Sequence, residues 1–249
     1  MLRWSHEGVA ALITDAKPKS VEWVQTAIAE PARSRSLREG TFTLEPDGTL
    51  VGEVTHTYTG HRGVDAKRIY DGLSERERID RVEDLSTSRL AGAQVTDIAI
   101  RNADSREGIF GYSYSIRVPG YAAGTGQRLF IQPNYGMKNA NPRFAVNDRE
   151  QDIYFDYPWT ETDRYTISLP DDFQLETPDT PKSFRAQDVG SYGIQLSHQD
   201  GVTFSYERNF TWGGGGAVIF PRDAYPQVKA IFDNQHQNDQ HMLTARRRQ

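Results

Sequence analysis

Apolar and polar residues alternate along much of this chain, and the alternation predicts a protein built mainly from strands. The clearest stretch is 110–118, where five apolar residues from Phe110 to Val118 are separated by small or polar ones. Successive side chains of a strand point to opposite faces, so one face of this strand is apolar and the other polar. We predict further strands at 8–14, 21–25, 39–45, 50–58, 96–100, 127–131, 151–156, 164–169, 191–197 and 201–210.

Turn and loop residues separate these strands. The sequence Pro46-Asp47-Gly48-Thr49 predicts a tight turn that closes a β-hairpin, because proline presets φ and glycine accepts a positive φ. A second turn, containing Pro18, is predicted between the first two strands. Residues 132–150 are rich in Asn and Pro and predict a long loop, and loops of that length are often functional.

Two regions have helical instead of strand periodicity. Apolar residues recur at helical spacing over 63–72 and 75–88, with a break between the two segments. Ser74, followed three residues later by Glu77, matches the capping-box pattern of a helix start. A further amphipathic helix is predicted after Pro221, near the C-terminus.

The composition agrees with a strand-rich fold. Hydrophobic residues make up only 37% of the chain, but aromatic residues reach 11%, a balance that favours sheets with one face in water. We predict a mainly β (α+β) fold: an antiparallel β-sandwich-like domain with a helical excursion near 61–89 and a C-terminal helix. Residues 1–38 are predicted to be the remnant edge of a preceding domain, and residues 39–249 a β-rich C-terminal domain.

The charge pattern argues against nucleic acid as a partner. The formal net charge is −5, and acidic and basic residues are interspersed, so the chain lacks the basic stripe that binding to phosphate backbones requires. The one basic run, Arg246–Arg248, is predicted to be a solvated tail. No apolar run approaches the roughly 20 residues of a membrane span, and the first residues do not form a signal peptide.

Several kinds of catalytic and cofactor site are excluded by residue type. The chain has no cysteine, which excludes disulfides, thiolate metal sites and a cysteine nucleophile. The glycines at 120–126 and 213–216 do not open a helix with phosphate-binding residues, so we expect no nucleotide cofactor. No G-x-S-x-G serine motif is present. We therefore predict no catalytic residue and no cofactor.

Histidines and carboxylates are the remaining candidates for metal binding and for acid–base chemistry. His236 and His241 are five residues apart where the last helix is expected to fray, so they do not share a helix face and we expect no metal site. His56, on the apolar face of its strand, is predicted to be a half-buried core histidine. Carboxylate pairs such as Glu161 and Asp163 are predicted to lie in turns, although general acid–base chemistry remains open.

Aromatic residues supply the candidate binding residues. Tyr135 lies in the long loop, and Trp159 and Trp212 flank the later strands. Core packing is the usual place for such side chains. The alternative is a stacking platform for glycan or peptide, which requires all three to be exposed in one patch.

A series of short motifs, in a particular order and spacing, resembles a known family. The motifs are Gly8–Ile13, Leu44–Gly52, Tyr58–Gly60, Pro119–Ala122, Arg128–Phe130, Tyr157–Pro158, Ile167–Pro170 and Pro221–Phe232. Over residues 7–246 the chain resembles the C-terminal part of bacterial transglutaminase-like proteins. These proteins join an N-terminal β domain of unknown function, a papain-like Cys-His-Asp core and a C-terminal β domain.

The resemblance implies that the catalytic thiol, histidine and acid lie upstream, so none of them falls on this chain. It also implies a periplasmic or cell-envelope location for a full-length parent, whereas a chain that truly starts at Met1 would be cytoplasmic. The expected partners are a transglutaminase-like core, in cis or in trans, and a peptide or glycan ligand.

Three functions follow from these observations. The first is a non-catalytic accessory domain of a transglutaminase-like protein, which positions the catalytic core or binds a partner or substrate peptide. The second is a stand-alone glycan- or peptide-binding β module that uses its aromatic residues. The third is a hydrolase with an unrecognised site.

Overall fold

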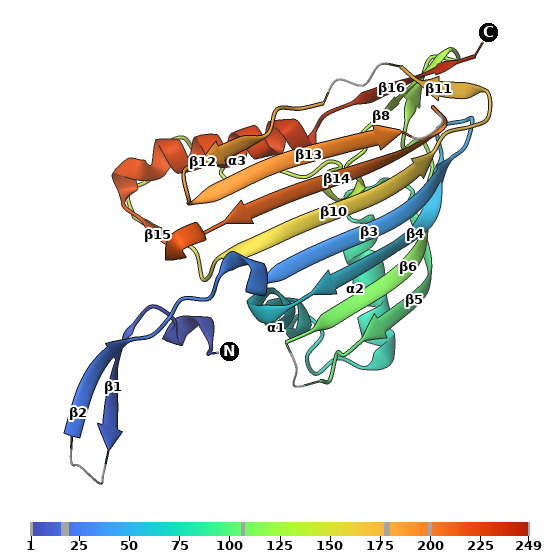
Figure 1. Cartoon of the computed structure of the whole chain (residues 1–249). Coiled ribbons are helices and arrows are strands. Elements are labelled where there is room, and N and C mark those ends of the chain that lie inside the picture. Colours follow the sequence, from blue (N-terminus) through green and yellow to red (C-terminus); the bar gives the residue numbers. More distant parts are fainter. Residues whose placement is uncertain (1, 16–19, 106–107, 177–179, 199–200, 249) are drawn as a thin grey trace.

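An eight-stranded sheet forms the body of the protein (Figure 1). The computed structural model describes residues 2–15, 20–105, 108–176, 180–198 and 201–248. Listed from one edge of the sheet to the other, the strands are β12 (Phe184–Ala186), β13 (Gly190–His198), β14 (Thr203–Trp212), β10 (Trp159–Ser168), β3 (Arg35–Leu44), β4 (Leu50–Tyr58), β6 (Phe110–Val118) and β5 (Gln94–Arg101).

Smaller sheets and helices complete the described part of the chain. A four-stranded sheet contains β11 (Phe173–Leu175), β16 (Leu243–Arg247), β8 (Arg128–Ile131) and β7 (Ala123–Gly124). The two-stranded sheets pair β1 (Ala10–Asp15) with β2 (Ser20–Gln25) and β15 (Ile219–Phe220) with β9 (Ile153–Tyr154). The α-helices are α1 (Gly60–Arg68), α2 (Glu75–Thr87) and α3 (Tyr225–Asp239). Short 3₁₀ turns are η1 (Trp4–His6), η2 (Pro31–Arg33), η3 (Tyr135–Met137), η4 (Gly214–Gly216) and η5 (Arg222–Ala224).

The predicted fold class is confirmed, with one pairing that differs. The fold is mainly β and sandwich-like, with helices where the sequence predicts them. All pairings in the large sheet are antiparallel except the central one, where β3 and β10 run parallel from Arg35 and Thr160 onward. Two antiparallel halves, β5-β6-β4-β3 and β10-β14-β13-β12, therefore meet along this pair. Alternation predicts which face a residue takes, but it does not predict the direction of the neighbouring strand.

The two faces of the large sheet have opposite character, as the alternation predicts. One face, which we call the covered face, packs against the helices, the long loop and the small sheet. Its buried side chains include Phe42, Val54, Tyr114, Ile167 and Phe204. The opposite, open face carries exposed polar side chains such as Thr41, Glu53, Arg117 and Arg164. A functional site on the sheet that is shielded from water must therefore lie on the covered face.

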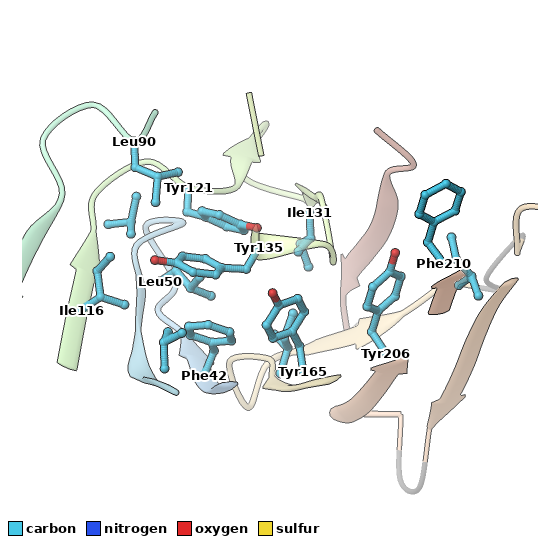
Figure 2. Close-up of a cluster of buried hydrophobic side chains, with 14 of the residues drawn as sticks. Phe42, Leu50, Leu90, Ile116, Tyr121, Ile131, Tyr135, Tyr165, Tyr206 and Phe210 are labelled. Carbon is cyan, nitrogen blue, oxygen red and sulfur yellow. The ribbon is translucent and has the colours of Figure 1, made fainter. Parts of the chain in front are cut away.

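Aromatic side chains make up much of the core beneath the covered face. Tyr135 lies between Phe42 and Tyr121, with ring centroids 4.9 and 6.4 Å away, and its ring meets Tyr165 edge-on at 6.0 Å (Figure 2). Tyr135 belongs to the predicted long loop, which contains η3. The loop is thus anchored in the core, where it can hold residues over the sheet.

Helix α3 covers the other half of the sheet (Figure 1). Its Phe232 packs against Trp212 at 4.7 Å, against Phe210 at 5.6 Å and against Phe155 at 5.8 Å, measured between ring centroids. The helix runs to Asp239, so the fraying expected around His236 is wrong: His236 lies inside the last helical turn.

The first two predicted strands, β1 and β2, form a separate hairpin that projects from the body (Figure 1). The indole of Trp23 is 71% exposed there. The predicted turn at Pro18 lies outside the described residues. The segment is attached to the body by a buried contact in which Glu7 Oε1 lies 3.0 Å from Nε2 of His61 on α1.

The predicted boundary between the two domains does not coincide with the end of a secondary-structure element. Strand β3 begins at Arg35, so residues 35–38 are part of the large sheet and the boundary at 38/39 falls within this strand. The origin of residues 1–38 in a preceding domain stays a prediction. Among the described helices, none is long and apolar enough to cross a membrane.

The predicted capping box at the start of α2 is confirmed. Ser74 accepts a hydrogen bond from the Glu77 amide, and the Glu77 carboxylate accepts one from the Ser74 amide at 2.8 Å. These contacts satisfy two of the amides that a helix start leaves without partners.

Replacing Ser74 with alanine removes this cap and should lower the free energy of unfolding by about 1 kcal/mol. Urea denaturation followed by circular dichroism measures the change. The matched control is Ser88→Ala at the other end of α2, for which we expect a change within about 0.5 kcal/mol. Equal effects of the two substitutions would contradict the capping role of Ser74.

Candidate functional site

Arg208 lies at the centre of a buried group of charged side chains on the covered face. It comes from β14, and its side chain is 0% exposed. Its Nε and Nη2 donate to Asp239 at 2.9 and 3.1 Å, and its Nη1 donates to Glu161 at 3.0 Å and to Asp163 at 3.2 Å. A buried charge is stable only when it is paired and hydrogen-bonded, so this arginine requires its carboxylates.

Asp239, the last residue of α3, connects the helix to the sheet through this group. Besides Arg208, its Oδ1 accepts hydrogen bonds from the Asn134 amide and the Tyr192 hydroxyl, both at 2.9 Å. Its Oδ2 accepts from Gln235, one helical turn earlier, at 3.2 Å. The carboxylate thereby fixes the C-terminal end of α3, the long loop and β13 relative to one another.

The two carboxylates on β10 extend the group toward β3 and α1. Asp163 binds the guanidinium of Arg38 on β3, with Nη2 and Oδ2 2.9 Å apart. Glu161 accepts hydrogen bonds from Arg62 of α1 and from the Trp159 indole, both at 3.0 Å. The result is a balanced charge network of three cations and three anions. Its members are Arg38, Arg62, Arg208, Glu161, Asp163 and Asp239.

The prediction that Glu161 and Asp163 lie in turns is wrong. Both belong to β10, which begins at Trp159, five residues before the predicted start at 164. They occupy positions on the covered face that apolar residues usually fill. The alternation of apolar and polar residues is therefore interrupted here, and the sequence does not reveal the strand. The arginines that neutralise them are more than 40 residues away along the chain.

A pocket of about 360 Å³ opens beside the charge network. Arginines 38, 62 and 143 line it, and Phe210 and Phe232 supply apolar wall. Its volume lies within the range of small-ligand sites, which combine apolar walls with a few polar groups. This combination suits a ligand that carries both a charged and an apolar part.

Three of the side chains that line the pocket carry nitrogen atoms without a hydrogen-bond partner among the described residues. Arg143 makes no hydrogen bond or ion pair with any described residue; its guanidinium lies 5.2 Å from the ring centroids of Phe155 and Trp159. Nε of Arg62 and Nδ1 of His236 are buried without a hydrogen-bond partner among the described atoms. Neither of these two atoms is open to the pocket, so it is Arg143 that indicates an acceptor-bearing ligand.

The electrostatics of the pocket favour a negatively charged ligand. Burial lowers the pKa of the Arg143 guanidinium, and the nearby charge of Arg62 lowers it further. Arg143 nevertheless stays protonated, because an arginine does not lose its proton in a protein. With the network itself balanced, Arg143 adds a positive charge that is in no ion pair with a described residue, and an anionic group in the pocket would neutralise it.

Glu161 is poorly suited to act as a general acid or base. Burial by itself raises the pKa of its carboxyl, but Arg208, Arg62 and Arg38 more than offset this effect and lower it to about 2. A carboxylate with so low a pKa is a weak base and stays ionised near neutral pH. The arrangement is therefore better suited to binding than to proton transfer.

The aromatic platform proposed from the sequence is not present. The side chains of Tyr135, Trp159 and Trp212 are only 5%, 3% and 0% exposed, so they cannot form a surface patch on which a sugar stacks. Tyr135 packs in the core under the sheet, and Trp212 packs against α3. Trp159 does border the site, because the guanidiniums of Arg62 and Arg143 lie over its ring at 5.0 and 5.2 Å.

Among the histidines, His56 is the core residue that the sequence predicts. Its ring stacks on Tyr112 at 4.6 Å and lies within hydrogen-bonding distance of the hydroxyls of Tyr58 and Tyr114. Burial, and then the charges of Arg38 and Arg89, lower the pKa of His56 to about 3, so it is neutral. Within the described residues, no group of three or more His, Cys, Asp or Glu side chains has an arrangement that could hold a metal ion.

Sequence reasoning missed the arginines of the site, although one signal was present. In the predicted strand at 201–210, the apolar positions 202, 204 and 206 are followed in the same phase by Arg208 and then Phe210. A charged residue in an otherwise apolar phase indicates a buried ion pair. Nothing comparable in the sequence singles out Arg143.

Residues 127–245 match a family model described as a domain of unknown function with a solved structure (DUF3858). No curated protein and no solved structure matches the chain significantly. The matched range contains Arg143, β10, β14 and α3. Arg38 and Arg62, which also line the pocket, lie outside it.

The depressed pKa of Glu161 predicts how its contribution to stability depends on pH. A carboxyl with a folded-state pKa near 2 and an ordinary value of 4.5 stabilises the folded state above pH 4.5 and loses this contribution as the pH falls toward 2. We expect Glu161→Gln to lower the free energy of unfolding at pH 7 by about 3 kcal/mol, because it leaves Arg208 and Arg62 short of a counter-charge.

The difference between the wild type and Glu161→Gln should shrink progressively below pH 4.5. Urea denaturation of both proteins from pH 7 to pH 2 measures it. The matched control is Glu53→Gln on the open face, for which we expect a change within about 0.5 kcal/mol. A difference for Glu161→Gln that stays constant over the whole range would contradict the electrostatic origin of the effect.

Proposed function

We propose that this chain is a non-catalytic binding module that holds the acidic group of a peptide, or of a partner's peptide segment, in the pocket beside the charge network. The observation that carries the proposal is the guanidinium of Arg143, which lines the pocket and makes no hydrogen bond or ion pair with any described residue. A carboxylate would supply acceptors for its donors.

A peptide fits the remaining surface of the pocket. Met137 is half-buried beside the pocket and offers an apolar contact, while the exposed amide of Asn141 provides both a donor and an acceptor for a peptide backbone. A glycan would instead stack on exposed aromatic rings. The three aromatic residues considered as a stacking platform for glycan or peptide are buried, so the peptide is proposed from the lining of the pocket and not from those rings.

We further propose that the module works beside a transglutaminase-like thiol core, in cis or in trans, in the periplasm or cell envelope. The support is the ordered series of motifs together with the absence of cysteine from the chain. In this arrangement the module binds an acidic segment of the substrate or partner and positions it for the core. The domain of unknown function that matches residues 127–245 names no activity, so this association rests on the resemblance.

The hydrolase alternative receives less support. Its carboxylates would have to exchange protons near neutral pH. Arg208 holds both Glu161 and Asp163, and the pKa of Glu161 is lowered to about 2. The contacts that make Glu161 a poor acid or base make it a structural anchor, and Asp163 binds the same arginine.

Isothermal titration calorimetry with two N-acetylated, C-amidated tripeptides tests the binding function. We expect the sequence Phe-Glu-Ala to bind and Phe-Gln-Ala to bind at least about tenfold more weakly, because the second lacks the charge that Arg143 recognises. Arg143→Gln should remove this preference for the acidic peptide.

The control is Arg76→Gln on α2, whose side chain is far more exposed and pairs with Asp80, and it should bind like the wild type. Equal affinity of the wild type for the two peptides, or an unchanged preference in Arg143→Gln, would overturn the proposal. Turnover of either peptide that disappears on mutating a pocket residue would favour the hydrolase instead.

A further inference from the structure

Arg38 also borders a second, smaller cavity. Its volume is about 50 Å³, and it lies between the C-terminal end of α2, strand β6 and the loop residues around η3. This is more than the roughly 10–15 Å³ that one water molecule needs on this measure, but far below the roughly 300 Å³ of an ordinary small-ligand site. Only a particle of a few atoms at most fits there.

Positive charge gathers around this cavity without negative charge. Arg38, Arg89 and Lys138 line it, and none of the described lining residues is an Asp or a Glu. Arg38 is neutralised on its far side by Asp163. Neither Arg89 nor Lys138 forms an ion pair with any carboxylate in the described part of the chain; Lys138 lies over the Tyr121 ring at 4.6 Å.

The guanidinium groups of Arg38 and Arg89 donate hydrogen bonds to the same backbone oxygen. The carbonyl oxygen of Gly136 accepts a hydrogen bond from Arg89 Nη2 at 2.9 Å and another from Arg38 Nη1 at 3.2 Å. The backbone approaches Arg38 so closely that a Cβ on Gly136 would lie 2.9 Å from its Cζ. Two like charges brought this close repel each other, and one carbonyl dipole compensates them only in part.

Neutral donors complete the lining. The hydroxyls of Tyr114 and Tyr135 lie 3.2 Å apart at the cavity, and His56 beside them is neutral. A hydroxyl can turn its proton toward an anion, and guanidinium and ammonium groups offer only donors. Burial lowers the pKa of both Arg89 and Lys138, with Arg38 lowering that of Arg89 further, as expected for cations that share a site without a counter-ion.

We propose that this cavity is a binding site for a small inorganic anion of the size of chloride, held by Arg89, Lys138 and Arg38 with the tyrosine hydroxyls beside it. The cavity is far smaller than an ordinary small-ligand site, which favours an ion of a few atoms over a peptide side chain. The site is distinct from the larger pocket, although Arg38 borders both. A bound anion would relieve the repulsion between Arg38 and Arg89 and so help to hold the arginine that the two sites share.

Chlorine-35 nuclear magnetic resonance tests the site directly, because chloride that exchanges onto a protein broadens the signal of the free ion. The measurement uses the Arg143→Gln protein in sodium chloride, so that the unpaired arginine of the larger pocket does not contribute. We expect broadening above that of buffer, removed by competing bromide. Adding Arg89→Gln and Lys138→Gln to this protein should return the line width to the buffer value.

The matched control adds Arg76→Gln and Arg222→Gln, which remove two exposed arginines that pair with neighbouring aspartates, and it should keep the full broadening. A second measurement uses the wild-type chain crystallised with sodium bromide, where an anomalous peak should lie beside Arg89 and Lys138. Absence of that peak, or equal broadening in the two triple variants, would overturn the proposal. Because the reference protein lacks Arg143, failure here leaves the peptide-binding proposal untouched, and failure of peptide binding leaves this one untouched.

Discussion

The guanidinium of Arg208 is the interaction on which the rest of the structure depends. It is fully buried and bound to carboxylates from two directions, Glu161 and Asp163 on β10 and Asp239 at the end of α3. These contacts join the central strands of the large sheet to the helix that covers one half of it. A buried ion network is not by itself a source of great stability, but removing one partner leaves a desolvated charge and is costly. Once the fold contains Arg208, it must keep all three acids.

The same network determines where positive charge is left over. Asp163 and Glu161 use their remaining oxygens on Arg38 and Arg62, so the network is balanced and has no anion to spare. Two further cations beside it, Arg143 and Arg89, form no ion pair with a described carboxylate. Arg38 is shared by the two cavities. The ion network that joins the sheet to α3 and the cations that are proposed to bind ligands therefore belong to one group of charges.

The sequence predicts the local structure well where one periodicity dominates. Residues 110–118 alternate without interruption and form β6, and the pattern of Ser74 and Glu77 marks the start of α2. The same reasoning fails at Glu161 and Asp163, because buried carboxylates in apolar positions resemble a turn. It also cannot find the parallel pairing of β3 with β10, since Arg38 and Asp163 meet across 125 residues of chain.

The site itself could not be predicted because its residues come from distant segments that only the fold brings together. Arg38 is on β3, Arg62 on α1, Arg143 in the long loop and His236 on α3. The aromatic residues that attracted notice in the sequence serve instead as support: Trp159 lies beneath the guanidiniums of two of these arginines. The aromatic side chains that are conspicuous in the sequence support the pocket, whereas arginines, which the sequence does not single out, line it.

The most direct measurement is a crystal structure of the chain grown with the acidic tripeptide. The account predicts that the peptide carboxylate lies within hydrogen-bonding distance of Arg143, with Arg208 unchanged in its contacts. A peptide carboxylate bound elsewhere, or a pocket closed by Arg143 turning onto Glu161, would contradict it.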